Sequence, residues 1–177
     1  MRLTGSTWQF CRPGSVARVV EWEQRVADLW ASFDDHSEDE FLARMEALIA
    51  ELGEDSARGA FERASAFDST GHPDQAVPLY RRAIELGLDG GLRRQAVIQL
   101  ASSLRNLGQP SESVELLTAE RGREADELDD AVNAFLALAL VDVGREREAV
   151  SVALEALTPH LSRYQRSLAN YARLIAE

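Results

Sequence analysis

The sequence contains a single cysteine and no lysine. Cys11 is the only cysteine among 177 residues, which excludes an intrachain disulfide framework, and we interpret it as an incidental residue of a flexible N-terminal tail over residues 1–14. All nineteen basic residues are arginine, which we interpret as a bias of base composition. The net charge of −11 should repel phosphate backbones, so we expect no nucleic-acid partner.

Long apolar runs are also missing. The longest nearly pure apolar stretch, FLALALV at residues 135–141, is far shorter than the ~20 residues that span a bilayer. The N-terminal segment lacks the apolar core and the small-residue cleavage site of a secretory signal. We therefore expect a cytoplasmic protein with no membrane partner.

Strand patterns are nearly absent, and apolar residues recur at helical spacing along most of the chain. A first helix is predicted over residues 15–33, with an apolar stripe formed by Val16, Val19, Val26, Leu29, Trp30 and Phe33. Ser37 and Glu40 then have the S-x-x-E spacing of a capping box, which predicts the start of a second helix. The acidic run around this position could alternatively be a metal site, with Asp34, Asp35, His36 and Asp39 as its ligands. Its spacing matches no calcium or zinc loop, so we expect no metal.

From residue 57 a pattern repeats. Gly71, Gly108 and Gly144 each follow a helical stretch, at intervals of 37 and 36 residues. Other residues keep fixed offsets from these glycines. The small residues before the glycines are Ala64, Ala101 and Ala137, and those after them are Ala76, Ser113 and Ala149. The large apolar residues before the glycines are Phe67, Leu104 and Leu140. A period of this size with paired helices is typical of a helical solenoid.

The repeated spacing has a physical reason. Glycine adopts the left-handed conformation that ends a helix, and Pro73 and Pro110 suit the start of the next one. Small residues at a helix crossing let two backbones approach to ~8–10 Å, and large apolar residues fill the space beside the crossing. The pattern therefore predicts antiparallel helix pairs.

These positions resemble the pattern of tetratricopeptide repeats. The best copy, residues 57–90, has the expected residues at Ala64, Phe67, Gly71, Ala76, Tyr80 and Ala83. The second copy, residues 94–127, departs from the pattern at Ser113, Leu117 and Glu120, and the third, from about residue 130, departs at Ala153. The chain also resembles small bacterial tetratricopeptide proteins through its segment QLASSLRNLG, residues 99–108.

The resemblance implies an all-α, right-handed α-solenoid of antiparallel helix pairs, with about three repeats over residues 57–158. Residues 15–56 are predicted to form an N-terminal helical hairpin, a possible degenerate repeat. Residues 159–177 are predicted to form a C-terminal capping helix, whose apolar stripe would be Leu161, Tyr164, Leu168, Tyr171 and Ile175.

The sequence shows no catalytic constellation. His36, His72 and His160 fall at predicted turns or helix starts without a nucleophile motif, and no glycine-rich phosphate-binding motif occurs. We therefore expect a protein that is not an enzyme and that uses no cofactor.

In the family that the chain resembles, exposed residues of the first helices line a concave groove. The resemblance places a partner-binding groove on one face of each first helix. In the first two repeats its residues would be Arg58, Phe61, Ser65, Asp68, Gln95, Ile98, Ser102 and Arg105. In the third repeat they would be Ala131, Ala134, Leu138 and Val141, and in the last helix Arg163, Arg166, Asn170 and Arg173.

Two of these faces have alternative interpretations. The apolar face around Leu138 is either a groove floor or a surface buried by neighbouring helices or by a second copy of the chain, and we favour burial. The arginine stripe of the last helix either binds an acidic peptide or is a solvated face that suits the C-terminal end of the helix dipole, and we favour the solvated face.

Together these features predict a binding module that holds a peptide or protein segment in its groove. The main alternative is a structural homo-oligomer, such as a homodimer, that uses an apolar helical face. A more distant alternative is an unrecognised enzyme or ligand sensor.

Overall fold

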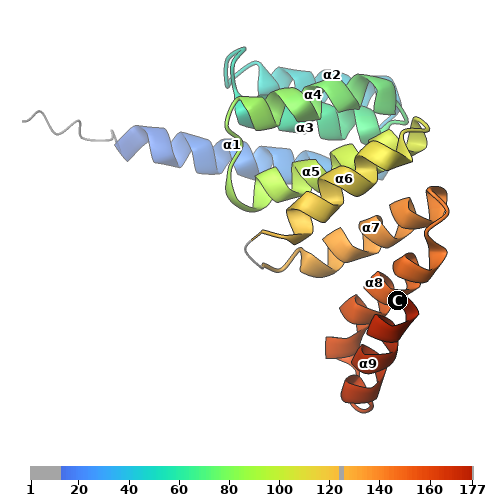
Figure 1. Cartoon of the computed structure of the whole chain (residues 1–177). Helices are drawn as coiled ribbons and strands as arrows, with labels where there is room; N and C mark the ends of the chain where they lie inside the picture. Colours follow the sequence, from blue (N-terminus) through green and yellow to red (C-terminus); the bar gives the residue numbers. More distant parts are fainter. Residues whose placement is uncertain (1–12, 124–125, 177) are drawn as a thin grey trace, which may run out of the picture. The chain divides into compact units, whose positions relative to one another are not determined.

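All regular elements in residues 13–123 and 126–176, which this computed structural model describes, are helical, and the all-α prediction is confirmed (Figure 1). The chain divides into two compact units, residues 1–51 and 52–177. The N-terminal unit contains α1 (Pro13–Ala31) and α2 (Glu38–Ile49). The second unit contains α3 (Ala57–Ser69), α4 (Pro73–Glu85), α5 (Gly90–Asn106), α6 (Pro110–Arg121), α7 (Asp129–Asp142), α8 (Glu146–Leu157) and α9 (Gln165–Ala176).

The N-terminal unit is a pair of packed helices. The indole N–H of Trp22 donates to the Leu48 carbonyl over 2.8 Å, and the buried apolar side chains are Trp22, Val26, Leu29, Phe41, Met45 and Ile49. Val19, predicted to lie on the packed stripe, is 52 % exposed instead. The capping box is confirmed, because the Ser37 side chain accepts from the Glu40 backbone and Glu40 bonds back to Ser37. Most of the predicted tail, including Cys11, lies outside the described residues, and α1 already begins at Pro13.

The second unit is built from helical hairpins whose turns are alike. Gly71, Gly108 and Gly144 have φ of +87°, +75° and +75°, so each adopts the predicted left-handed conformation. At the first of these turns the backbone N–H of Gly71 donates to Asp68 and that of His72 to Phe67, over 3.1 and 2.8 Å. The same pair of bonds closes the other two turns. Pro73 and Pro110 start α4 and α6, as predicted.

Small side chains lie at the buried centre of each hairpin. The predicted crossing residues are all buried: Ala64, Ala76, Ala101, Ser113, Ala137 and Ala149. Large apolar side chains fill the adjoining space, and Tyr80, Leu104, Leu117 and Leu140 are almost completely buried. The third repeat departs at Ala153, which is exposed. The spacing read from the sequence therefore describes the core of this unit correctly.

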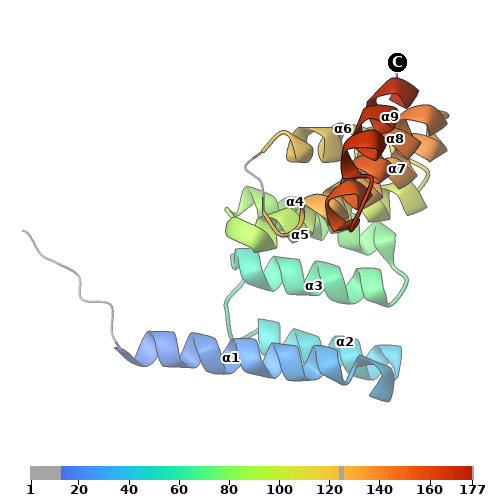
Figure 2. The same ribbon diagram turned by 90° about the horizontal axis from the view of Figure 1, so that it is seen from below.

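The first helices of the hairpins form one layer of the second unit. Each of α3 to α8 packs on the next helix in the chain, and in addition α3 contacts α5 and α5 contacts α7 (Figures 1 and 2). Contacts between successive first helices draw that side of the stack together. This layer is therefore the inner side, on which a solenoid carries its concave surface.

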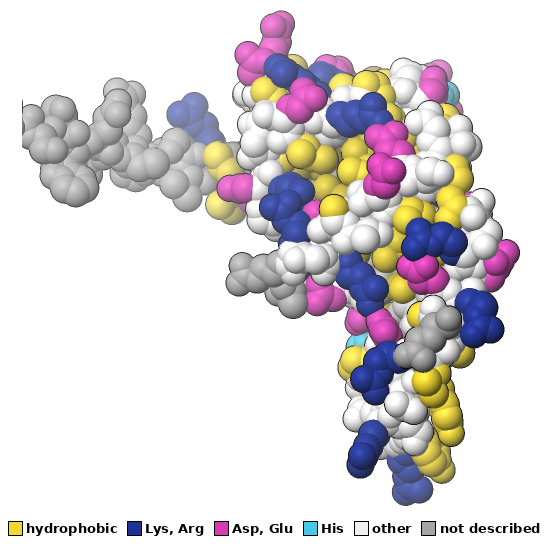
Figure 3. All heavy atoms as spheres, viewed as in Figure 1, with side chains coloured by type: hydrophobic (Ala, Val, Ile, Leu, Met, Phe, Trp, Pro, Cys, Tyr) yellow, Lys and Arg dark blue, Asp and Glu magenta, His cyan; other side chains and the backbone are white. Residues whose placement is uncertain are grey.

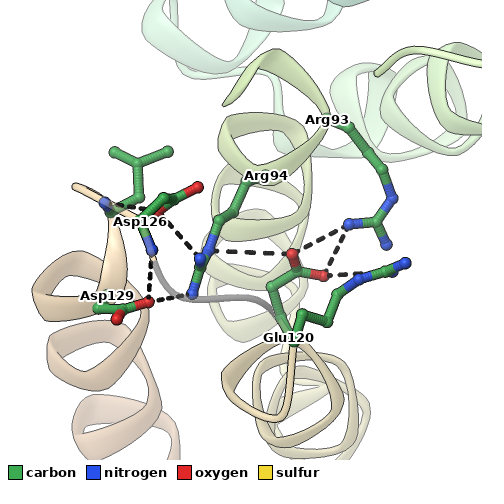
Figure 4. Close-up of polar contacts among 7 residues, drawn as sticks. Arg93, Arg94, Glu120, Asp126 and Asp129 are labelled. Carbon is green, nitrogen blue, oxygen red and sulfur yellow. Dashed lines mark hydrogen bonds and ion pairs between the residues drawn. The ribbon is translucent and has the colours of Figure 1, made fainter. Parts of the chain in front are cut away.

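A buried ion network joins the second and third hairpins (Figure 4). Glu120, on α6, is 3 % exposed and lies 2.8 Å from the Arg93 guanidinium on α5. The buried Arg94 guanidinium lies 2.9 Å from Asp126 and 2.6 Å from Asp129, at the start of α7. Glu120 occupies a position where the repeat pattern expects a small residue. The network explains the departure, because the carboxylate is paired with cations of the neighbouring helix.

The last helix, α9, packs on α8 with a different face from the one predicted. Ala172 is completely buried and Leu168 and Ile175 are partly buried, whereas Tyr164 and Tyr171 are 78 % and 61 % exposed. The Arg147 side chain on α8 donates to the Ile175 carbonyl over 3.0 Å. The predicted stripe was therefore wrong for its two tyrosines, since the buried contact needs a small residue, which Ala172 supplies.

Candidate protein-binding surfaces

On α3, most of the predicted groove residues belong to the interior or to internal contacts. Phe61 and Ser65 are each only 5 % exposed, so the prediction that they face a partner is wrong. Phe61 packs in the core beside Tyr80, with ring centroids 6.3 Å apart, because the inner layer is closed by the next hairpin. The Arg58 guanidinium lies 2.9 Å from the buried carboxylate of Glu62 and is held along the helix.

Asp68 is the centre of a polar cluster between α3 and α5. Its carboxylate accepts from the Ser103 hydroxyl over 2.8 Å and from the Tyr80 hydroxyl over 3.4 Å. Ser65 also bridges the two helices, since its hydroxyl donates to Gln99 over 3.3 Å. Burial raises the pKa of Asp68, against the effect of the two hydroxyl bonds, and burial likewise raises the pKa of Tyr80. These contacts give Asp68 a structural role in joining two hairpins.

The predicted residues on α5 are also mostly occupied. Ile98 is 6 % exposed and packs in the core of the third hairpin, so its predicted exposure is wrong. The Arg105 guanidinium pairs with the Asp142 carboxylate at the end of α7. Ser102 is half-buried, and Gln95 is exposed. The inner layer is therefore largely closed by its own contacts from α3 to α5.

The α7 face, formed by Ala134, Leu138 and Val141, remains open. Leu138 is 48 % exposed and Val141 is 50 % exposed, and Ala134 is also exposed. Burial of this face by neighbouring helices, which the sequence favoured, is therefore wrong. The opposite side of α7 does pack in the core through Val132, Leu136, Ala139 and Leu140. The α7 face is thus an apolar surface that the described chain does not cover.

The α9 face is an open depression lined by Arg166, Ser167, Asn170, Tyr171 and Arg173. The structure brings three predicted site residues together here, because positions three, four and seven residues apart share a side of a helix. Arg173 donates to the Asn170 side chain over 3.3 Å. The end of the unit that carries α9 shows arginine and apolar side chains in view and no acidic ones (Figure 3). Arg163 lies outside the depression.

Sequence reasoning missed the buried polar contacts. Tyr80, Gln99 and Ser103 gave no signal of their own, since hydroxyl and amide groups occur on any helix. Glu120 did give one, because a carboxylate at a small-residue position of the repeat needs a buried cation. The adjacent Arg93 and Arg94 could have been matched to it.

Within residues 13–123 and 126–176, no group of three His, Cys, Asp or Glu side chains is arranged to hold a metal ion. Among the described helices, none is long and apolar enough to cross a bilayer. The His160 imidazole lies 2.8 Å from the Asp130 carboxylate.

Comparisons with known proteins agree with this architecture. A family model described as Tetratrico peptide repeat matches residues 57–175. The chain is similar to the crystal structure of a Podosopora anserina protein with nearly identical TPR-like repeats, named for kinesin light chain. The TM-score is 0.60 and the identity 16 %, covering 88 % of this chain and 94 % of that one.

It is also similar to MamA of MSR-1, with a TM-score of 0.58 and 18 % identity over 92 % of this chain and 93 % of that one. No curated protein sequence matches the chain. At these identities the structural likenesses show the fold alone, a right-handed α-solenoid.

Proposed function

This chain belongs to the tetratricopeptide repeat family, and on that premise we propose that it is a binding module whose α7 face holds an apolar part of a partner protein. Family membership supports a protein-interaction scaffold rather than an enzyme. The net charge of −11 favours a protein partner over a nucleic acid. The inner layer supplies a rigid support, since α7 is fixed on its other side by a packed core.

The exposure of Leu138 and Val141 carries the proposal. Both side chains lie on the inner layer and leave about half of their surface in water. Full burial of one such side chain contributes about 1.5–3 kcal/mol, so burying the exposed half of both would contribute on the order of 2 kcal/mol to the free energy of binding. Apolar side chains held on a rigid helix also lose little entropy when a partner binds.

The chain provides a matched test of this surface. Val150, on α8, is 47 % exposed and thus resembles Leu138 in exposure but lies on the second helix of the pair. We expect Leu138→Asp to abolish capture of a specific protein from a lysate of the source organism, while Val150→Asp leaves it intact. Quantitative mass spectrometry of both captures makes the comparison. Equal capture by the two variants would contradict the proposal.

A second copy of the chain is the competing occupant of the α7 face. Light scattering at high concentration separates the two cases. A dimer that Leu138→Asp converts to a monomer would assign the face to self-association and would contradict a role in holding a partner.

A further inference from the structure

The α9 face combines cations with aromatic surface and lacks acidic residues. Residues 156–176 contain three arginines and no aspartate or glutamate, in a chain with 30 acidic and 19 basic residues. Arginine elsewhere in this unit is mostly committed to carboxylates, as Arg81 is to Glu112 and Arg121 is to Glu155. Within the described residues, Arg166 and Arg173 have no carboxylate partner. These two cations are therefore available to an external anion.

The geometry of the α9 face defines the spacing of that anion. Arg166 and Arg173 are seven residues apart, which places them two turns and ~10.5 Å apart along α9. Asn170 accepts from Arg173 and so restrains its guanidinium, while Ser167 offers a hydroxyl in the same depression. Tyr171 also lines the depression and exposes 61 % of its surface. The depression therefore combines two cationic sites with one exposed aromatic side chain.

We propose that the α9 face binds a short acidic segment of a partner protein, with two carboxylates about 10 Å apart on either side of an apolar residue. Guanidinium groups match carboxylates through paired charge-assisted hydrogen bonds, and tyrosine and arginine are enriched among residues that dominate binding energy. In a segment with polyproline II geometry, which has three residues per turn and rises ~3.1 Å per residue, carboxylates three positions apart lie on the same side with about this separation. The inference rests on the proposed function as a protein-binding module and names the chemistry of its partner.

Other occupants fit the charges less well. The chain's own first twelve residues contain Arg2 and Arg12 and no acidic residue, so this segment is not complementary to the α9 face. Long polyanions, such as nucleic acid or an anionic lipid surface, would also meet the rest of a chain with net charge −11. A short carboxylate segment touches the arginines alone.

A titration followed by amide chemical shifts tests the inference. The probe is a synthetic peptide with two glutamates three positions apart and a leucine between them, and the control peptide carries glutamine in place of both glutamates. We expect the acidic peptide to shift resonances of α9 and to bind more tightly than the control. Arg166→Gln and Arg173→Gln should each weaken binding about tenfold, the effect of losing one charge-assisted contact.

Arg163→Gln is the matched control, because it removes the same charge from the same segment outside the depression. It should change the affinity less than either of the other variants. Equal affinity for the two peptides, or an equal loss in all three variants, would overturn the inference. So would self-association that depends on Arg166, or tighter binding of an anionic vesicle than of the peptide.

The two proposals fail separately. If the Leu138-dependent capture persists while the acidic peptide shows no preference for α9, only the inference about α9 is refuted. If the peptide binds α9 but capture is insensitive to Leu138→Asp, only the assignment of the α7 face is refuted.

Discussion

Ser103 and Ser113 should respond in opposite directions to the same substitution. Both side chains are 0 % exposed. The Ser103 hydroxyl donates to the Asp68 carboxylate over 2.8 Å, whereas within the described residues the Ser113 hydroxyl has no hydrogen-bond partner. Ser103→Ala loses a bond to an ionised group and should cost about 1.5–3 kcal/mol. Ser113→Ala removes an unpaired buried hydroxyl and should stabilise the fold by about 1 kcal/mol.

Urea unfolding followed by far-ultraviolet circular dichroism measures this difference. Tryptophan fluorescence is unsuitable, because Trp8, Trp22 and Trp30 all precede the unit that contains both serines. A difference of about 3 kcal/mol in the free energy of unfolding separates the midpoints of the two variants by about 1–3 M urea at ordinary slopes. Destabilisation by both substitutions to the same extent would contradict this prediction, since packing would then outweigh hydrogen bonding at both sites.

Other contacts give further predictions. Gly108→Ala should cost about 1–2 kcal/mol of stability, because the residue has φ of +75°; an added Cβ would meet no atom, so the cost is conformational. Gly91→Ala, inside α5, should be neutral or slightly stabilising, and thermal unfolding compares the two variants. Asp68→Asn should become more stable relative to the wild type as pH rises from below 3.8. Burial raises the folded-state pKa of Asp68, so the free energy that its protonated form contributes to folding is present below 3.8 and is lost as pH rises above it. A constant difference across a series of urea titrations at stepped pH would contradict this. Glu120→Ala should cost at least about 2 kcal/mol by leaving Arg94 and Arg93 with fewer partners, and a midpoint in urea unchanged from the wild type would show that the network contributes nothing.

The turns and helix crossings could be predicted because they depend on local properties of single residues. Gly71, Gly108 and Gly144 end helices since glycine adopts positive φ at little cost, and that requirement is the same in any surrounding fold. The small residues at the crossings follow from the distance between helix axes. Both signals recur in the chain, so each copy supports the others.

The exposure of particular side chains could not be predicted from the repeat pattern. Phe61 and Leu138 occupy positions assigned to the same face of their first helices, yet one is buried and the other is half exposed. Their exposure depends on how closely the next hairpin approaches, and the Asp68 cluster and the Arg105–Asp142 pair contribute to that approach. Such contacts join residues more than thirty positions apart, beyond the reach of helical periodicity.

The packing face of α9 was misjudged for a related reason. Tyrosine has a large apolar ring and a polar hydroxyl, so its place on a stripe is compatible with either burial or exposure. The contact with α8 selects Ala172, which is small enough to let the two helices approach. This contact leaves Tyr171 exposed in the same depression as Arg166 and Arg173, and the candidate surface on α9 follows from that exposure.

Site-specific crosslinking tests most directly whether the α7 face holds a partner. Cys11 is the only cysteine, so Cys11→Ser followed by Leu138→Cys or Val150→Cys places one photoreactive group at a chosen position. We predict that illumination in a native lysate joins the Leu138→Cys chain to a distinct second protein and that the Val150→Cys chain gives no such adduct. Adducts of the same identity and yield from both positions, or an adduct formed only with another copy of the chain, would contradict the account.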